Sequence, residues 1–192
     1  MIKYMLTTRC NKKCQYCITK NVKVTDEPDL TRIFFMLRTL HKKGHKDIML
    51  TGGEPTLHDN FEGIATYANA VGMNVFVTSQ NPDILKMKLK VEAISFSLHD
   101  IRKIPDASIY HTTYACVLAE QFFQELPDIL IGKGYKGLTI NENQRDNFMP
   151  FNESIVHTSP LLSLKINRTG HCMDETIILP NLKVITDFRP YL

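Results

Sequence analysis

Apolar and polar residues follow two different periods along the chain, and the alternation of these periods predicts strands and helices in turn. Short apolar runs typical of buried strands occupy residues 2–7, 47–53, 73–79, 93–100 and 135–143. Apolar residues recur at helical spacing between them, in residues 28–44, 60–72 and 111–126. Pro28 suits the first turn of the first helix, and Gly44 suits its end. The last apolar runs, at 161–170 and 175–188, predict two or three more strands.

The order of these elements predicts an α/β fold. Strands that alternate with helices form parallel sheets with right-handed crossovers. A complete eightfold barrel takes about 250 residues, and this chain has 192. We therefore expect an open, partial TIM-like β/α barrel of about five to six mainly parallel strands. Because no repeat or linker-like tract divides the sequence, residues 1–192 are predicted to form one domain. Its core would be residues 1–140, followed by a lid-like loop and C-terminal strands at 141–192.

Chemically distinctive polar residues follow each of the first five predicted strands. They are Cys10 and the residues after it, then Gly52, Gly53 and Glu54, then Ser79 and Asn81, then Ser97 and His99, and finally Asn141 to Asn143. Ligands of parallel α/β sheets bind at the carboxyl ends of the strands. We therefore expect these residues to meet at one site.

Composition and hydropathy predict a soluble cytoplasmic protein. Hydrophobic residues make up 43% of the chain and charged residues 22%, which is ordinary for a globular protein. No apolar run reaches the roughly 20 residues that a membrane-spanning helix needs. The N-terminus has no apolar stretch followed by a small-residue cleavage site, so a secretory signal is not predicted. In the cytoplasm thiols stay reduced.

Basic residues are concentrated in the first part of the chain, although the formal net charge is only +3. Residues 1–46 carry eleven Lys and Arg against three acidic residues. This excess indicates either a solvated basic face or a docking surface for an acidic partner. Aromatic and basic residues are not interleaved as they are in proteins that bind single-stranded nucleic acids, so a nucleic-acid site is not predicted.

Three of the five cysteines, Cys10, Cys14 and Cys17, lie within eight residues. Clustered cysteines in a reducing compartment indicate a metal site, and thiolates select zinc or iron–sulfur clusters. Structural zinc takes four closed ligands, and no fourth is obvious here. Cys116 is expected to be a buried core residue of the helix at 111–126, and Cys172 either a turn thiol or a residue near the metal or substrate. A 4Fe–4S cube held by three cysteines leaves one iron open for chemistry.

Two motifs together resemble those of the radical S-adenosylmethionine (SAM) enzymes. One is CNKKCQYC, residues 10–17, and the other is TGGEP, residues 51–55, which follows at the end of the next strand. The resemblance covers the first hundred residues. It implies that Cys10, Cys14 and Cys17 bind three irons of a 4Fe–4S cluster, and that the fourth iron chelates the amino and carboxylate groups of SAM. Tyr16 then matches the aromatic residue near the adenine, or shields the cluster.

The same resemblance implies cofactor contacts from the second motif. Gly52 and Gly53 would let the backbone approach the methionine end of SAM. Glu54 would accept a charge-assisted hydrogen bond from the amino group. The expected chemistry is one-electron cleavage of the sulfonium, which yields methionine and a 5′-deoxyadenosyl radical that abstracts a substrate hydrogen.

Further contacts are implied at the ends of the third and fourth predicted strands. Ser97 matches a residue that meets the ribose or the carboxylate of SAM. His99 stands where related proteins often have Asp. Ser79 or Asn81 would supply another cofactor contact or cap a turn.

The implied electron donor is acidic. Iron–sulfur potentials span about −700 to +450 mV, and the cleavage of SAM needs the low end of this range. The family's usual donors are flavodoxins and ferredoxins, and we hypothesise that Lys12, Lys13 and Lys20 guide their docking.

The sequence says less about the substrate than about the cofactors. Residues 141–160 are polar and long enough for an active-site lid, in which Asn143, Arg145 and His157 are candidates to recognise an anionic substrate; a solvated surface loop is the alternative. The small size resembles that of 7-carboxy-7-deazaguanine synthase, which favours a small-molecule substrate. It also resembles the short glycyl-radical-enzyme activating enzymes, whose substrate is a protein. A non-catalytic zinc-binding module is a third interpretation, but it leaves the Gly-Gly-Glu motif unexplained.

Overall fold

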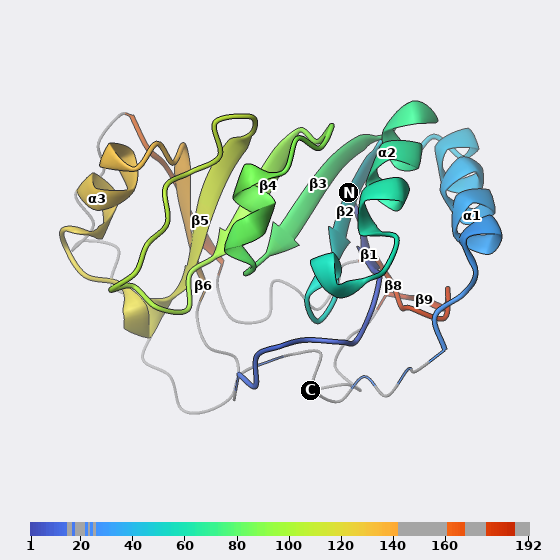
Figure 1. The fold of residues 1–192 in the computed structure, drawn as a ribbon, viewed down its shortest axis with the longest axis horizontal. Coiled ribbons are helices and arrows are strands. Elements are labelled where there is room, and N and C mark those ends of the chain that lie inside the picture. Colours follow the sequence, from blue (N-terminus) through green and yellow to red (C-terminus); the bar gives the residue numbers. More distant parts are fainter. Residues whose placement is uncertain are drawn as a thin grey trace.

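The computed structural model describes residues 1–14, 17, 22, 24, 26–141, 161–167 and 176–186. These residues form one nine-stranded sheet with α-helices and short 3-10 helices between the strands (Figure 1). The strands are β1 (Ile2–Met5), β2 (Asp47–Thr51), β3 (Asn74–Ser79), β4 (Ala93–Ser97), β5 (Thr112–Leu118), β6 (Gly137–Asn141), β7 (Ser163–Asn167), β8 (Ile177–Ile178) and β9 (Val184–Ile185). The helices are α1 (Leu30–Lys42), α2 (Phe61–Ala70) and α3 (Leu126–Gly132), with 3-10 helices η2 (Pro55–Leu57), η3 (Pro82–Lys86) and η4 (Ala119–Gln121).

The sheet is open and almost entirely parallel. Its strand order is β7-β6-β5-β4-β3-β2-β1-β8-β9, and every neighbouring pair is parallel except β8 and β9. Within the described residues the two end strands, β7 and β9, do not pair with each other, so the expected open, partial barrel is confirmed. The sheet has more strands than five or six because the apolar tail contributes β7, β8 and β9.

The first helix illustrates how local sequence sets the element boundaries. The Asp29 carboxylate accepts a hydrogen bond from the backbone N–H of Arg32 at 2.9 Å and caps α1, so Pro28 precedes the cap. At the other end Gly44 adopts φ +89, a left-handed conformation that favours glycine and stops the helix. The predicted helix at 28–44 is therefore present, two residues shorter at each end.

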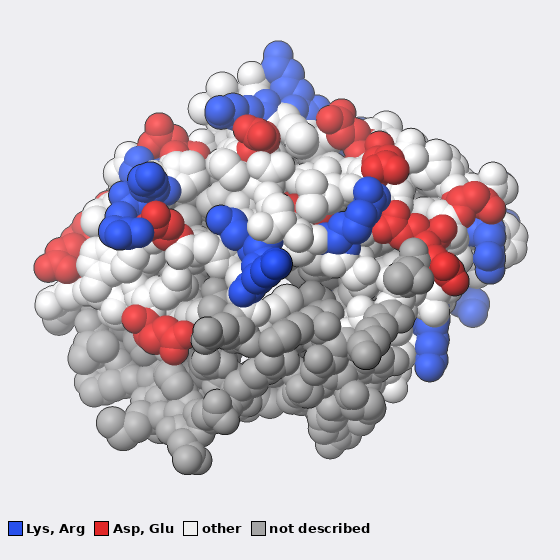
Figure 2. Space-filling model, turned by 60° about the horizontal axis from the view of Figure 1, so that its bottom comes forward, with Lys and Arg blue, Asp and Glu red and all other residues white. Residues whose placement is uncertain are grey.

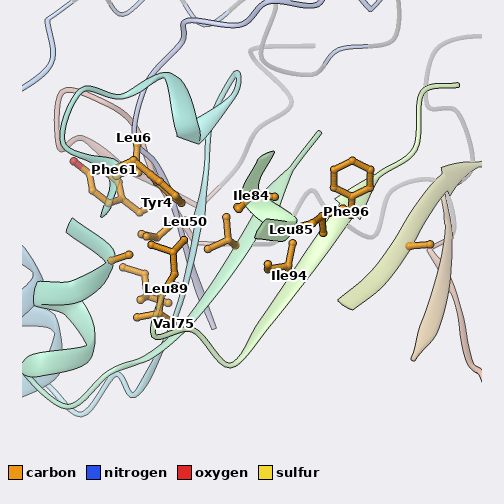
Figure 3. Close-up of a cluster of buried hydrophobic side chains, with 14 of the residues drawn as sticks. Tyr4, Leu6, Leu50, Phe61, Val75, Ile84, Leu85, Leu89, Ile94 and Phe96 are labelled. Carbon is orange, nitrogen blue, oxygen red and sulfur yellow. The ribbon is translucent and has the colours of Figure 1, made fainter. Parts of the chain in front are cut away.

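One face of the sheet and the helices bury a continuous hydrophobic core. Alternate strand residues such as Leu50, Val75 and Ile94 point into it, as period-two strands require. Phe61 contributes from α2, and α1 and α3 add further buried aliphatic side chains to the same core. Figure 3 shows how these side chains interdigitate between strands and helices. This packing fixes the directions of the strands and therefore the positions of the loops that leave them.

The opposite face of the sheet is here called the open face. It consists of the strand residues that alternate with the core positions, and these are partly or fully exposed: Lys3, Met49, Phe76, Thr78, Ser95, Ser97, Tyr114, Cys116, Thr139 and Lys165. Its composition is mixed and polar, unlike the aliphatic core face. A face with this composition is available for binding rather than for packing.

A second, smaller apolar cluster joins the residues on either side of the three clustered cysteines to the tail of the sheet. Met5 of β1 and Val22, five residues after Cys17, pack against Ile177 and Leu179. Strand β8 pairs with β1, and the Lys3 N–H donates to the Thr176 carbonyl at 3.1 Å. The tail segment therefore supports the strand from which the cysteine loop departs.

The prediction of a helix at residues 111–126 is wrong except at its last residue, Leu126, where α3 begins. Residues 112–118 form β5, in which Thr113, Ala115 and Val117 are buried and the residues between them are less buried. This period of two, with β-branched and aromatic residues, is typical of a strand. Cys116 is consequently not a helix core residue but lies on the open face, paired in register with Ser97. Helical structure starts only after β5, in η4 and then α3.

Several predictions fall outside the described residues. These are Tyr16, Lys20, the proposed lid with Asn143, Arg145 and His157, and Cys172. For the part of the chain that is described, no helix combines the length and apolarity needed to span a bilayer.

Candidate functional site

The carboxyl ends of β1 to β4 bring the predicted site residues to one edge of the sheet. Because these strands are adjacent and parallel, their following loops leave from the same edge. Side-chain contacts join the loops, among them those between Gln80 and Asn11, between Ser79 and Glu54, and between His99 and Cys14. The predicted convergence is therefore found for the residues after these four strands.

The cysteine loop, residues 10–17, places Cys10, Cys14 and Cys17 at this edge, and none of them forms a disulfide within the described residues. Cys10 is exposed, whereas Cys14 and Cys17 are half-buried. The Lys12 N–H donates to Cys10 Sγ at 3.4 Å, and the Cys17 N–H donates to the Cys14 carbonyl at 3.3 Å. Burial raises the pKa of the Cys10 thiol, the Lys12 N–H lowers it, and the nearby charges of Cys17, Glu54 and Cys14 raise it. Cys14 and Cys17 are thus close enough to disfavour the ionisation of Cys10, a repulsion that a cationic centre relieves.

This donor set fits an iron–sulfur cube. In the described part of the chain, no three His, Cys, Asp or Glu side chains converge on a point that could hold a single metal ion. A 4Fe–4S cube does not need such convergence, because each cysteine binds a different iron at a different corner. Soft thiol donors on one short loop satisfy three corners and leave the fourth for another ligand.

His99 reaches the cysteine loop from the end of β4. Its Nδ1 lies 3.8 Å from Cys14 Sγ, and its carbonyl accepts a hydrogen bond from Gln121 Nε2 at 3.4 Å. Burial lowers the pKa of the imidazole, Lys12 lowers it further, and Glu54 opposes both. The residue that departs from the family pattern therefore contacts a predicted iron ligand.

Gly52 and Gly53 must be glycines because the backbone of residues 7–9 passes close to them. The Gly53 N–H donates to the Thr7 carbonyl at 2.8 Å, and Gly52 has φ +153. A Cβ on Gly52 would lie 2.5 Å from the Thr7 carbonyl oxygen, and one on Gly53 would overlap the carbonyl oxygens of Thr8 and Arg9. The two glycines thus let the second motif pack directly against the start of the cysteine loop.

Glu54 is a fully buried hub for the loops after β2 and β3. Its Oε1 accepts hydrogen bonds from the Ser79 hydroxyl at 2.7 Å and from the Thr56 hydroxyl and N–H at 2.8 and 3.2 Å. Its Oε2 accepts one from the Gln80 N–H at 2.9 Å. The Glu54 N–H in turn donates to the Arg9 carbonyl at 2.8 Å. One carboxylate therefore fixes the second motif to the cysteine loop and to the end of β3.

Ser79 and Asn81 support this hub. The buried Ser79 hydroxyl donates to Glu54 and accepts from the Asn81 N–H at 3.0 Å, so both of its functions are used within the chain. The Asn81 side chain donates to Thr56 Oγ1 and accepts from the Asp83 N–H, which caps η3. Both residues serve as turn caps here, and a cofactor contact from either stays a prediction.

Ser97 differs from Ser79 because its hydroxyl has no hydrogen-bond partner among the described residues. It ends β4 on the open face, half-buried, two residues before His99. An unpaired hydroxyl at this place is available to a ligand.

An ion-pair network joins the residue just before the cysteine loop to acidic residues of two other segments, and this network was not predicted from the sequence. Arg9 donates to Glu27 and to Asp59, both at 3.1 Å, and Glu27 lies 3.8 Å from the buried His58. Burial lowers the pKa of His58, Glu27 raises it, and Arg9 lowers it. Because these partners are up to 50 residues apart in the chain, no local pattern indicates their pairing.

Basic side chains do not gather into one uniform patch in the view of Figure 2. Lys and Arg alternate with Asp and Glu over the described surface of that face (Figure 2). Lys12 and Lys13 are nevertheless exposed on the cysteine loop itself. They remain candidates for contact with an acidic donor.

Comparison with known proteins points in the same direction as this geometry. The family model described as the radical SAM superfamily matches residues 4–110, more than half of the chain. GTP 3′,8-cyclase of Stenotrophomonas maltophilia is 33% identical over 92 residues, which cover 46% of this chain and 28% of that protein. Fe-coproporphyrin III synthase of Methanosarcina barkeri is 28% identical over 114 residues, 55% of this chain and 29% of that protein. The matched region spans less than a third of these curated relatives.

Solved structures share the fold over nearly the whole chain. Streptococcus suis SuiB bound to S-adenosylmethionine superposes with a TM-score of 0.72 at 12% identity, covering 96% of this chain and 57% of that chain. SuiB bound to its precursor peptide SuiA gives a TM-score of 0.72 at 13% identity, covering 96% and 58%. At these identities the likeness establishes the fold alone.

Proposed function

Because the chain belongs to the radical SAM superfamily, we propose that it cleaves SAM reductively and uses the product to abstract a hydrogen atom from a small-molecule substrate. Membership implies a 4Fe–4S cluster and SAM as cofactors. The reduced thiols that the cluster needs favour a cytoplasmic location. Residues 1–140 would act as the core of one domain and residues 141–192 as its lid and terminal strands.

The cysteine loop is the proposed cluster site. Cys10, Cys14 and Cys17 would each hold one iron, and Tyr16 would lie beside the adenine. When bound, the cluster supplies the electron that splits the sulfonium of SAM. The protein's own task is to fix the three thiolates and to keep the fourth corner accessible.

The second motif would hold the methionine end of SAM. A carboxylate has about four acceptor sites, two on each oxygen. Glu54 Oε1 receives three hydrogen bonds and Oε2 only one, so Oε2 retains capacity for the ammonium group. Ser97, with its unpaired hydroxyl, would contact the ribose or the carboxylate of SAM.

The observation that carries the proposal is the direct packing of the two motifs. Backbone hydrogen bonds from Gly53 and Glu54 to Thr7 and Arg9 tie the glutamate hub to the residues just before Cys10. A cluster on the loop and an amino acid on the hub would therefore be held in one rigid unit, as catalysis by positioning requires.

The substrate assignment is supported by the polar open face of the sheet. The curated relatives are named for small molecules, GTP for one and a coproporphyrin for the other. SuiB, in contrast, has been crystallised with a precursor peptide. A protein substrate, as for a glycyl-radical-enzyme activating enzyme, is the second candidate. A zinc module is not carried further, since family membership accounts for both motifs.

The test is anaerobic reconstitution with iron and sulfide, followed by dithionite and SAM. We expect the wild type to contain about four irons per chain and to form 5′-deoxyadenosine, and Cys14→Ala to do neither. Cys116→Ala is the matched control, because it removes a thiol that lies outside the loop and should keep the iron content. Equal 5′-deoxyadenosine from Cys14→Ala and wild type would refute the proposal.

A further inference from the structure

A cavity of about 250 Å³ lies on the open face and is distinct from the cysteine loop. Strands β2 to β7 all contribute to its lining. Met49, Phe76 and Ala93 supply an apolar wall from β2, β3 and β4. Small-molecule sites typically have such walls together with a few polar groups.

Four of the five polar side chains that line this cavity have no hydrogen-bond partner in the described part of the chain. Among the described residues, no hydrogen bond is formed by the hydroxyls of Ser95, Tyr114 and Thr139 or by the ammonium group of Lys165. The fifth polar lining residue shows the contrast, since the Ser163 hydroxyl donates to the Lys136 carbonyl at 3.2 Å. Three free hydroxyls and one cation around an apolar wall are the groups that a polar ligand would satisfy.

The sheet register connects this cavity to the strand end beside the cysteines. Ser97 pairs with Cys116, Cys116 with Thr139, and Thr139 with Lys165, so these four side chains form one row on the open face. At about 4.8 Å per strand the row is about 14 Å long. Its Ser97 end lies two residues from His99, which contacts Cys14. A ligand in the cavity would therefore lie within a small molecule's length of the proposed SAM site.

We propose that this cavity binds the substrate, and that the substrate is a flat, largely apolar compound with one anionic group, a carboxylate or a phosphate. Its anionic group pairs with Lys165, the charged residue of the described lining, and its body lies against Phe76 and Met49. The hydroxyls of Tyr114 and Thr139 bind polar atoms on its edge. Calling the ligand a substrate rests on the proposed function; the site itself does not.

The binding test uses the full chain without iron, so that it is independent of the radical chemistry. The chain contains no tryptophan, so the fluorescence of an added indole is free of protein indole background. Indole-3-carboxylate and indole-3-carboxamide have similar shape and differ in charge. We expect the carboxylate to bind at least about tenfold more tightly, as the loss of a charge-assisted hydrogen bond would predict. Competition by benzoate and by phenyl phosphate then distinguishes the two kinds of anion.

Variants of Lys165 assign this preference to the cavity. Lys165→Met keeps the apolar stem and should abolish the preference for the carboxylate, while Lys165→Arg should retain it. Lys136→Met, at an exposed lysine that does not line the cavity, should bind like the wild type. Phe76→Ala should weaken the binding of both indole compounds, because it removes part of the apolar wall.

Each other outcome overturns the inference. Absence of saturable binding, equal affinity for the two indoles, or an equal effect of Lys165→Met and Lys136→Met would each do so. A chain that makes no 5′-deoxyadenosine but shows the Lys165-dependent preference would refute the proposed function and leave the anion site standing.

Discussion

Replacement of Glu54 tests whether one buried carboxylate holds the site together. In Glu54→Ala the hydroxyls of Ser79 and Thr56 can rotate to new partners, but the N–H groups of Thr56 and Gln80 cannot. An unsatisfied buried donor costs about 1–3 kcal/mol, so the two would cost about 2–6 kcal/mol. Both lie in part-buried positions, so we expect about 2–4 kcal/mol, a large share of the roughly 5–15 kcal/mol of a typical domain.

Glu54→Gln separates charge from shape. The amide oxygen can keep the three hydrogen bonds of Oε1, but the amide NH₂ would face the Gln80 N–H, and two donors cannot bond each other. We expect a loss of about 1–3 kcal/mol from this one conflict.

The assay is equilibrium unfolding in urea at 25 °C, in which the midpoint falls and the slope is unchanged. Glu62→Gln, an exposed acid on α2, is the matched control and should stay within about 0.5 kcal/mol of the wild type. If Glu54→Ala unfolded with the same free energy as the control, the hub would not contribute to stability and the reasoning would fail.

Three further predictions concern the loop and its surroundings. Gly53→Ala should displace the cysteine loop, lower stability by about 1–3 kcal/mol and reduce iron uptake, whereas the control Gly63→Ala, whose added Cβ meets nothing within 4 Å, should be neutral or stabilising. Thermal unfolding and iron content measure the difference, and equal behaviour of the two variants would contradict the packing argument. Replacing Lys12, Lys13 and Lys20 together by Gln should slow reduction by flavodoxin at low salt but not by dithionite, and equal loss with both reductants would exclude guided docking. Burial lowers the pKa of His58 in the fold, so stability from its neutral form is fully present above pH ~6.5 and is lost as the pH falls below that value. His58→Gln should flatten this decline of stability below pH ~6.5, and an unchanged decline in urea midpoints would argue against it.

The sequence identified the elements whose signals are local. Strands such as β2 and β3 were predictable because their apolar residues are bounded by glycine and by polar turns, and the glycine at 44 stops α1 as expected. Residues 111–126 were misassigned because Tyr114, Val117 and Leu118 satisfy a helical spacing, while burial follows Thr113, Ala115 and Val117. Periodicity alone does not separate these cases when an apolar run is short.

Contacts between distant segments could not be predicted from the sequence. The cysteine triplet and the Gly-Gly-Glu motif each have a characteristic spacing within a short stretch of sequence, so the chemistry of each could be predicted from the sequence. The pairing of Arg9 with Glu27 and Asp59, and the addition of β8 beside β1, depend on the path of the whole chain. The sequence predicts that Gly52 and Gly53 leave space for a ligand, and the structure shows that they also leave space for the backbone of Thr7 and Arg9.

The packing of Ile177 and Leu179 beneath Met5 and Val22 also sets an order of events in biosynthesis. The strand that leads to the cysteines leaves the ribosome well before its partner on one side, β8, which is made only after some 170 further residues. Until β8 is made, Met5 and Val22, on either side of the cysteine loop, lack the apolar side chains against which they pack. A nascent chain thus carries its three cysteines for some time before the segment that supports their strand exists.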